Sequence, residues 1–297
     1  MNPRILQLLV FNVKTGRREF HITKCLSRFF EKDPKGGYPK VYDRLEKSDT
    51  STLGKIRTGY QQIVEEFSLL KDEIKELSFM DPTIGLKEYA VDVKWKFHDN
   101  PKALKEWVIT CDSDYNAGFS TVSLELSPGG KGLFTGYLDT KLPKDGKLKR
   151  TGYCNMKSLP PRKAFQREEP FDWGMYTHIV LKVRGDGRSY MLGITTKVSY
   201  DLMWHDVYMF PMYTRGGPYW QYVRIPFSKF FMSSKGRIQD KQASIPLHEV
   251  RTFGITIADA IPGSYRLEID YIGLQYDPSH EEEFAYESYR VDPFILV

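Results

Sequence analysis

Two acidic residues, two positions apart, are the most suggestive candidates for chemistry in this sequence. Glu268 and Asp270 lie in the segment RLEIDYI, whose alternation places both carboxylates on one strand face. Glycosidases use two carboxylates across a glycosidic bond, one of them kept protonated by its surroundings. Because Leu267, Ile269 and Tyr271 would take the core face, we interpret the acids as a solvated strand face rather than a catalytic pair.

Cysteine and histidine residues are too scattered to suggest a catalytic or metal site. The three cysteines form no C-x-x-C pair, and Cys111 and Cys154 are typical of buried, reduced thiols in strands. The six histidines occur singly. In the glycine-rich SPGGKGLFTG, Lys131 precedes Gly132 instead of the Ser or Thr of a phosphate-binding loop. The sequence therefore predicts no catalytic residue, no metal site and no cofactor, and a protein that is not an enzyme.

The segment KVRGDGRSY, residues 182–190, carries a glycine-rich turn between arginines. It is flanked by the strand-like segments HIVLKVR and SYMLGI. Asp186–Gly187 between two strands favours a type I′ β-hairpin, because both central residues of that turn need positive φ. Gly185 would permit a bulge beside it. We interpret Gly185, Asp186 and Gly187 as a structural turn, in preference to a phosphate cradle or an exposed adhesion tripeptide.

Short strand-like segments dominate residues 81–277. In EYAVDVKWKF, alternation puts Tyr89, Val91, Val93, Trp95 and Phe97 on one face. Many similar segments follow, rich in aromatic and β-branched residues and bounded by Gly, Pro, Asp or Ser. No helix-length pattern separates them, which disfavours a parallel α/β sheet. The pattern predicts an all-β domain, either a β-sandwich or a jelly roll.

The segments outside this domain differ in composition. Residues 1–30 hold six basic residues and one acidic residue, a composition typical of a mitochondrial transit peptide. Residues 31–80 predict a linker and then an amphipathic helix over 53–78, packed either on its own domain or on a partner. Residues 278–297 combine acidic and apolar residues and predict a C-terminal arm, lying on the protein's own body or on a partner.

The patterns of charge and hydropathy exclude two classes of protein, one that binds nucleic acid and one that spans a membrane with a helix. The whole net charge of +5 belongs to residues 1–30, and the rest of the chain carries equal numbers of basic and acidic residues. A neutral body offers no basic surface for nucleic acid. No stretch approaches the ~18 consecutive apolar residues of a membrane-spanning helix.

The best candidate for a partner-binding surface is the segment YTRGGPYWQYVRIPF. Strand alternation directs Val223 and Ile225 to the core, so the side chains between them should face outward. Exposed Trp, Tyr and Arg together are typical of an interface hot spot. We predict contacts to a partner protein from Arg215, Trp220, Tyr222 and Arg224. The alternative is that the C-terminal arm or the helix 53–78 covers these side chains.

An ordered series of motifs resembles the mitochondrial complex I intermediate-associated protein family. The matching motifs are Val183–Arg188, Gly216–Gln221, Ile225–Phe227 and Ile257–Asp259, the last with isoleucine in place of the family's leucine. The resemblance runs through residues 82–290 and is strongest over 150–290. So long an ordered set is far more specific than any single motif above.

This resemblance implies a fold, a role and partners. The implied fold is a galactose-binding-like jelly roll without known catalysis. The implied role is a chaperone for assembly of the membrane arm of complex I, in the mitochondrial matrix and peripheral to the inner membrane. The implied partners are complex I assembly intermediates, an ECSIT-type adaptor and an acyl-CoA dehydrogenase-like flavoprotein. The alternative from the residues is a carbohydrate-binding or sugar-processing jelly roll, with a stacking platform of Trp204, His205, Tyr219 and Trp220.

Overall fold

The computed structural model describes residues 52–78, 87–144, 151–197, 206–234, 236–240 and 242–282. The predicted transit peptide and linker lie outside these residues, as do Trp204, His205 and the C-terminal arm beyond residue 282.

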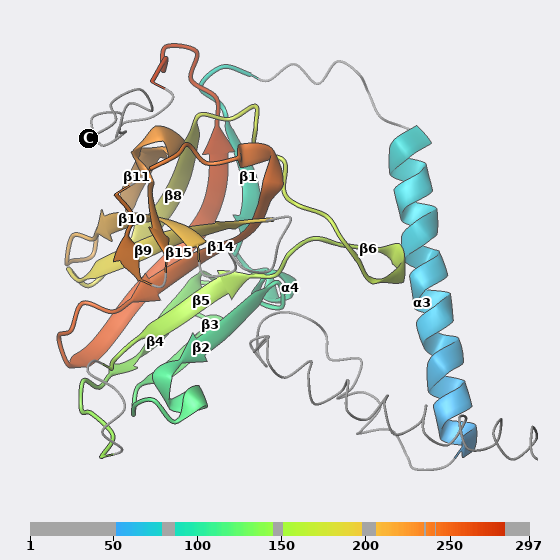
Figure 1. Ribbon diagram of the computed structural model, residues 1–297, viewed down its shortest axis with the longest axis horizontal. Helices are drawn as coiled ribbons and strands as arrows, with labels where there is room; N and C mark the ends of the chain where they lie inside the picture. Colours follow the sequence, from blue (N-terminus) through green and yellow to red (C-terminus); the bar gives the residue numbers. More distant parts are fainter. Residues whose placement is uncertain are drawn as a thin grey trace, which may run out of the picture. The chain divides into compact units, whose positions relative to one another are not determined.

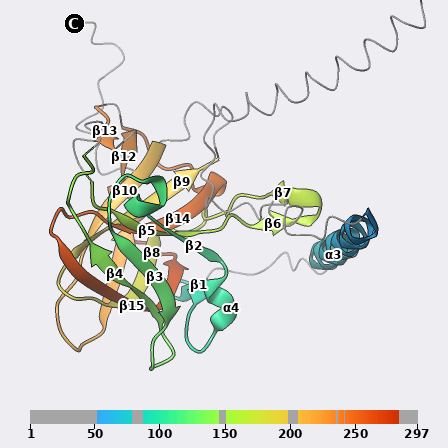
Figure 2. The same cartoon turned by 90° about the horizontal axis from the view of Figure 1, so that it is seen from below.

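Two antiparallel sheets form the body of the protein (Figures 1 and 2). The first sheet has the order β11 (Gln221–Pro226), β8 (His178–Arg184), β15 (Gly263–Gln275), β4 (Gly132–Leu138) and β3 (Thr121–Leu126), and β1 (Val91–Lys96) pairs with β15. The second has the order β13 (Arg237–Ile238), β12 (Phe231–Ser234), β10 (Asp206–Tyr213), β9 (Ser189–Thr196), β14 (Val250–Ile257), β5 (Cys154–Ser158) and β2 (Trp107–Cys111). The predicted all-β jelly-roll sandwich is therefore confirmed.

Aromatic side chains from both sheets fill the space between them. Trp95 of β1 stacks on Phe253 of β14, with ring centroids 6.2 Å apart, and meets Trp107 of β2 at 5.3 Å. Trp173 and Phe227, from the connections, stack 5.8 Å apart at one end of this cluster. All five side chains are buried. Rings of this size bury much apolar area and fix the two sheets face to face.

Short helical segments interrupt the connections between strands. Helix α4 (Pro101–Leu104) is capped by the Asn100 side chain, which accepts a hydrogen bond from the Lys102 backbone N–H. Single 3₁₀ turns are formed by η1 (Asp112–Tyr115), η2 (Ala164–Gln166), η4 (Phe227–Lys229) and η5 (Leu247–Glu249).

Helix α3 (Thr52–Ser78) precedes the sandwich and contacts the small hairpin of β6 (Arg162–Lys163) and β7 (Arg167–Glu168). Glu66 accepts a hydrogen bond from the Phe165 backbone N–H at 2.6 Å, and Glu73 pairs with Arg167 at 2.5 Å. The Phe67 ring meets the Phe165 ring edge-on at 5.8 Å. The helix thus contacts its own domain, while large apolar side chains on it stay exposed: Tyr60, Ile63, Val64 and Phe67.

The prediction of a β8–β9 hairpin at Gly185–Gly187 is wrong. Strand β8 belongs to the first sheet and β9 to the second, so the turn carries the chain from one sheet to the other. Gly187 has the positive φ of +93° that the sequence suggested, but Asp186 does not, so the turn is not type I′. Gly185 is needed because a Cβ there would lie 2.3 Å from the Thr214 side chain. The three residues form a turn, but one shaped by neighbouring loops.

Two β-bulges break the expected alternation. Strand β1 shifts register against β15 between Val93 and Trp95, so Val93 is exposed whereas Trp95 is buried. The prediction that both share one face is therefore wrong. Strand β15 shifts against β8 between Ile269 and Tyr271. An extra residue on one strand of a pair reverses the facing of every residue beyond it.

Candidate partner-binding surface

A cluster of rings and basic groups lies on the outer face of the first sheet, where β11 pairs with β8. Tyr222 lies directly opposite Lys182 in this pairing. The Lys182 ammonium group is 5.5 Å from the Tyr222 ring and 5.7 Å from the Trp220 ring, and the Arg184 guanidinium group is 5.1 Å from the Trp220 ring. These distances suit cation–π attraction. We call Lys182, Arg184, Trp220 and Tyr222 the cation–aromatic surface.

Two acidic side chains of β15 form ion pairs with the basic side chains of this surface. Asp270 pairs with Lys182 at 2.9 Å and with Lys131 at 2.6 Å. Glu268 pairs with both Arg184 and Arg266. Both acids are buried, so the prediction that they form a solvated strand face is wrong. Basic side chains cover them because a buried carboxylate requires a partner of opposite charge.

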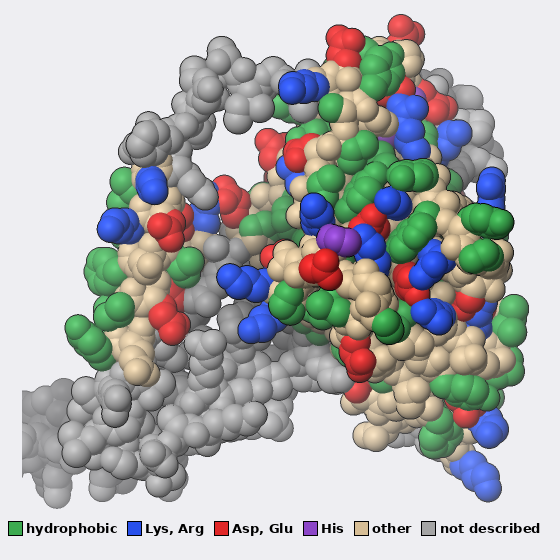
Figure 3. Space-filling model, turned by 180° about the vertical axis from the view of Figure 1, so that it is seen from behind, with side chains coloured by type: hydrophobic (Ala, Val, Ile, Leu, Met, Phe, Trp, Pro, Cys, Tyr) green, Lys and Arg blue, Asp and Glu red, His purple; other side chains and the backbone are tan. Residues whose placement is uncertain are grey.

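These ion pairs bear on both the chemistry and the charge of the face. Burial alone would raise the pKa of Asp270, but hydrogen bonds from Lys131 and Lys182 outweigh it, and the pKa is lowered. A hydrogen bond from Lys182 to Asp270 also raises the pKa of the lysine. Asp270 is thus ionised at neutral pH, not a proton donor. Because basic side chains cover Asp270 and Glu268, the groups that this cluster offers to solvent are cations and rings. Figure 3 shows the molecule from behind, where basic, acidic and hydrophobic side chains are interspersed.

The structure brings together two of the four predicted partner-binding residues. Tyr222 is 66% exposed and Trp220 half-buried, both on the predicted outer face. Arg224 shares that face but pairs with Asp277, which follows β15. Arg215 lies in the exposed loop before β11, and in the described part of the chain no hydrogen bond or ring contact joins its side chain to Trp220 or Tyr222. Lys182 and Arg184 were missed, although their alternation with Leu181 and Val183 in HIVLKVR signals an outward position.

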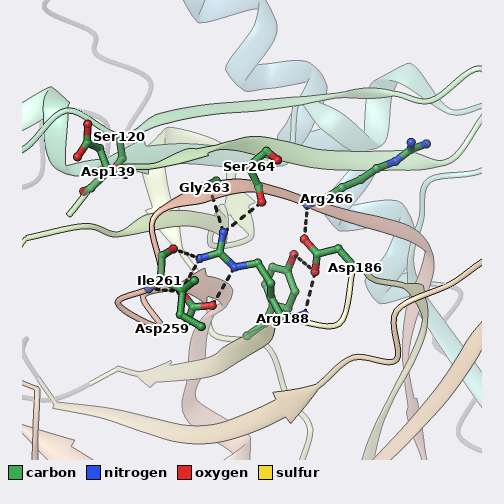
Figure 4. Close-up of polar contacts among 10 residues, drawn as sticks. Ser120, Asp139, Asp186, Arg188, Asp259, Ile261, Gly263, Ser264 and Arg266 are labelled. Carbon is green, nitrogen blue, oxygen red and sulfur yellow. Dashed lines mark hydrogen bonds and ion pairs between the residues drawn. The ribbon is translucent and has the colours of Figure 1, made fainter. Parts of the chain in front are cut away.

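Arg188 of the segment KVRGDGRSY is bound within the protein (Figure 4). Arg188 donates to both carboxylate oxygens of Asp259, at 2.8 and 2.6 Å, and to the carbonyl oxygens of Ile261, Gly263 and Ser264. Burial opposes ionisation of Asp259, yet the hydrogen bonds from Arg188 lower its pKa overall. A guanidinium group with these contacts is not free for a phosphate.

Asp186 of the same segment is exposed, but its carboxylate is bound within the protein. Its carboxylate accepts hydrogen bonds from the backbone N–H groups of Arg188 at 3.0 Å and Arg266 at 2.7 Å, and from the Tyr190 hydroxyl at 3.3 Å (Figure 4). Because the carboxylate has three donors within the protein, we assign Asp186 a structural role.

The described cysteines and acidic residues are not arranged for thiol catalysis or metal binding. Cys111 and Cys154 are buried and free, as predicted, and face each other across the β2–β5 pair. Burial raises the pKa of the Cys154 thiol to about 12, which disfavours the nucleophilic thiolate. Among the described residues, no three or more His, Cys, Asp or Glu side chains are arranged to hold a metal ion.

A buried histidine makes stability depend on pH. Burial, with repulsion from Arg224, lowers the pKa of His178 from 6.5 to about 4. The unfolded chain therefore binds more protons between these values, so this contribution is present above pH 6.5 and is lost as pH falls towards 4. We expect a loss of roughly 2–3 kcal/mol in the free energy of unfolding. The measurement is urea denaturation from pH 7 to pH 4.

The matched variant is His178→Asn, which keeps a polar atom near Thr177 but does not titrate. As pH falls, its free energy of unfolding should decrease less steeply than that of the parent. The difference between the two profiles cancels the contribution of the carboxylates, which both proteins share. The exposed His248→Asn is the control and should follow the parent. Parallel profiles for the parent and His178→Asn would show that His178 is not held neutral.

Comparison with known proteins finds several relatives. The family described as Complex I intermediate-associated protein 30 (CIA30) matches residues 95–269. A Drosophila melanogaster protein named "Complex I intermediate-associated protein 30, mitochondrial" is 44% identical over 282 residues, covering 94% of this chain and 93% of that protein. The Mus musculus protein of the same name is 39% identical over 231 residues, covering 76% of this chain and 70% of that protein.

Solved structures resemble the chain more weakly. The family 11 carbohydrate-binding module of a Clostridium thermocellum cellulosomal cellulase aligns with a TM-score of 0.45 and 13% identity, covering 66% of this chain and 99% of that module.

Proposed function

The chain belongs to the complex I intermediate-associated protein 30 family, and from that premise we propose that it is a non-enzymatic scaffold in the assembly of mitochondrial complex I. We further propose that it acts on the membrane arm, binding an assembly intermediate through the cation–aromatic surface together with Arg215 and Arg224. An ECSIT-type adaptor and an acyl-CoA dehydrogenase-like flavoprotein are the partners we would examine first.

The observation that carries the binding proposal is one cluster on the outer face of β8 and β11. In it the exposed Tyr222 ring and the half-buried Trp220 ring lie against the half-buried cations of Lys182 and Arg184. Trp, Tyr and Arg contribute most of the binding energy in protein interfaces, because they bury large areas and desolvate well. The carboxylates beneath hold the cations in place, so the surface is ordered before a partner arrives. Preorganisation reduces the entropy cost of binding.

The non-enzymatic proposal has its own support. A sugar hydrolase needs one carboxyl group protonated and one ionised. The only acids whose spacing suggested this in the sequence, Glu268 and Asp270, are each engaged by two basic side chains.

The binding proposal is tested with the double variant Trp220→Ala, Tyr222→Ala. We expect the protein to fold normally, because Tyr222 is exposed and Trp220 half-buried, and to retain about a tenth or less of the assembly intermediate that co-purifies with the parent. Arg224 is left in place because removing it would leave the buried Asp277 without its guanidinium partner. Affinity purification from cells with quantitative mass spectrometry gives the ratio.

The matched control is Tyr137→Ala, an exposed tyrosine on β4 of the same sheet. It should co-purify the intermediate as the parent does. Parental recovery by the folded double variant would place the interface elsewhere on the molecule.

We also propose that the protein resides in the mitochondrial matrix, associated with the inner membrane. The support is the basic segment 1–30 and the word "mitochondrial" in the relatives' names. In the described ranges, no helix is both long and apolar enough to cross a membrane. In fractionated mitochondria, the protein should resist protease until the inner membrane is opened and should be released from membranes by carbonate. Digestion in intact mitoplasts would contradict a matrix location.

A further inference from the structure

The described chain ends at the C-terminal end of β11, the strand that borders the cation–aromatic surface. After β15, Asp277 pairs with Arg224 of β11, and the His280 ring lies 4.9 Å from the His178 ring of β8. Ser228, just after β11, lies 3.2 Å from His280 Nε2 and donates a hydrogen bond to Glu282 at 3.3 Å. A hydrogen bond from Ser279, aided by Arg224, lowers the pKa of Asp277 to about 2, so this contact persists at physiological pH. The described chain therefore ends, at residue 282, near the C-terminal end of β11, the strand that carries Tyr222 and follows Trp220.

The tail that follows, residues 283–297, has the composition that this surface would attract. Its sequence, EFAYESYRVDPFILV, holds three acidic residues and one basic residue, interleaved with four aromatic residues. The surface offers the reverse, two cations between two rings, with its own carboxylates buried beneath. Carboxylates can pair with Lys182 and Arg184 while tail rings pack on Trp220 and Tyr222.

The reach of the tail is sufficient. From Ser228 back along β11 to Trp220 is eight residues, or about 26 Å of extended strand. Fifteen residues span about 50 Å when extended. The effective concentration of so short a tether lies in the millimolar range, so a weak contact suffices to keep the surface occupied.

We propose that residues 283–297 form a strap that occupies the cation–aromatic surface and is displaced when a partner binds there. The proposal of a strap is supported by the opposite charges of the tail and the surface, by the length of the tail, and by the place where the described chain ends. Its role as a competitor rests on the proposed function, because it requires the partner to use the same surface. Tyr222, the most exposed member of the surface, is then protected in the free protein and released on assembly.

The test uses the full chain, a version ending at Glu282 and a fluorescently labelled synthetic peptide of residues 283–297. Fluorescence anisotropy should show micromolar binding of the peptide to the truncated protein, and at least tenfold weaker binding to the full chain, whose surface is already covered. Tyr222→Ala in the truncated protein should reduce binding about tenfold, whereas Tyr137→Ala should not. A peptide carrying Gln and Asn at its three acidic positions should bind more weakly, and the difference should shrink at high salt.

Three outcomes would overturn the strap: no binding of the peptide to the truncated protein, equal binding to both versions, or binding that is indifferent to Tyr222→Ala. A full chain that dimerises, and becomes monomeric on truncation, would assign the tail to a second copy instead. Capture of the assembly intermediate separates the two proposals. If the peptide binds as expected but truncation leaves capture unchanged, the strap stands and the partner uses another surface.

Discussion

Replacing Arg188 with alanine should lower the free energy of unfolding by about 3–5 kcal/mol. The side chain is only 12% exposed and forms a two-pronged ion pair with Asp259, which is equally enclosed. Its remaining N–H groups bind three carbonyl oxygens of residues 261–264. The variant leaves a buried carboxylate without its partner and releases the loop between β14 and β15 from the crossover between the sheets.

Equilibrium denaturation in urea measures this loss, and two further variants make it specific. Arg188→Lys keeps the charge but not the planar fork, so it should lie between parent and alanine variant. Arg237→Ala removes an exposed arginine from β13 and should change stability by less than about 0.5 kcal/mol. A parental midpoint for Arg188→Ala would mean that the guanidinium group is dispensable to the fold, and would reopen a ligand-binding role for Arg188.

Asp112→Ala should be comparably destabilising, by about 2–5 kcal/mol. Its side chain, in a residue only 1% exposed, accepts hydrogen bonds from the backbone N–H groups of Ser120 and Gly152, both at 2.9 Å. It also accepts from the hydroxyl groups of Ser120 and Thr151. Those hydroxyls have second acceptors in backbone carbonyls, so the cost comes mainly from two buried N–H groups left without partners.

The contrast between two substitutions tests this explanation. Asp112→Asn retains one oxygen and the shape of the site, so it should recover about half of the lost stability. Asp240→Ala, at an exposed position, is the control. Thermal denaturation followed by near-ultraviolet circular dichroism reports the loss of tertiary packing directly. Equal stability of the parent and Asp112→Ala would contradict a stabilising role for the hydrogen bonds that this carboxylate accepts from Ser120, Thr151 and Gly152.

The architecture was largely predictable because it rests on local patterns. Alternating apolar residues in HIVLKVR and YWQYVRIPF fixed which faces of β8 and β11 are buried, and the exposed Tyr222 and buried Ile225 agree with that alternation. The same patterns could not reveal the bulge before Trp95 or the one after Ile269. A bulge is set by the pairing partner, which the strand's own sequence does not name.

The candidate site was only partly predictable for a similar reason. The outward positions of Trp220 and Tyr222 could be predicted from the alternation in a single segment. The cations beside them come from β8, and the buried acids come from β15, almost fifty residues further along the chain. Asp-Gly suggested a hairpin because the local signal is strong, yet the turn's hydrogen bonds go to residues 214 and 266. Contacts between distant segments decide which sheet a strand joins.

The central claim is that the cation–aromatic surface meets a complex I assembly intermediate, and photo-crosslinking from position 222 tests it most directly. A photoreactive amino acid replaces Tyr222 in cells, and the same replacement at Tyr137 serves as reference. We expect crosslinks from position 222 to membrane-arm subunits or their assembly partners, with few from position 137. If the protein still co-purifies with the intermediate but position 222 yields no crosslink to any of its subunits, the surface we propose is not the one that binds.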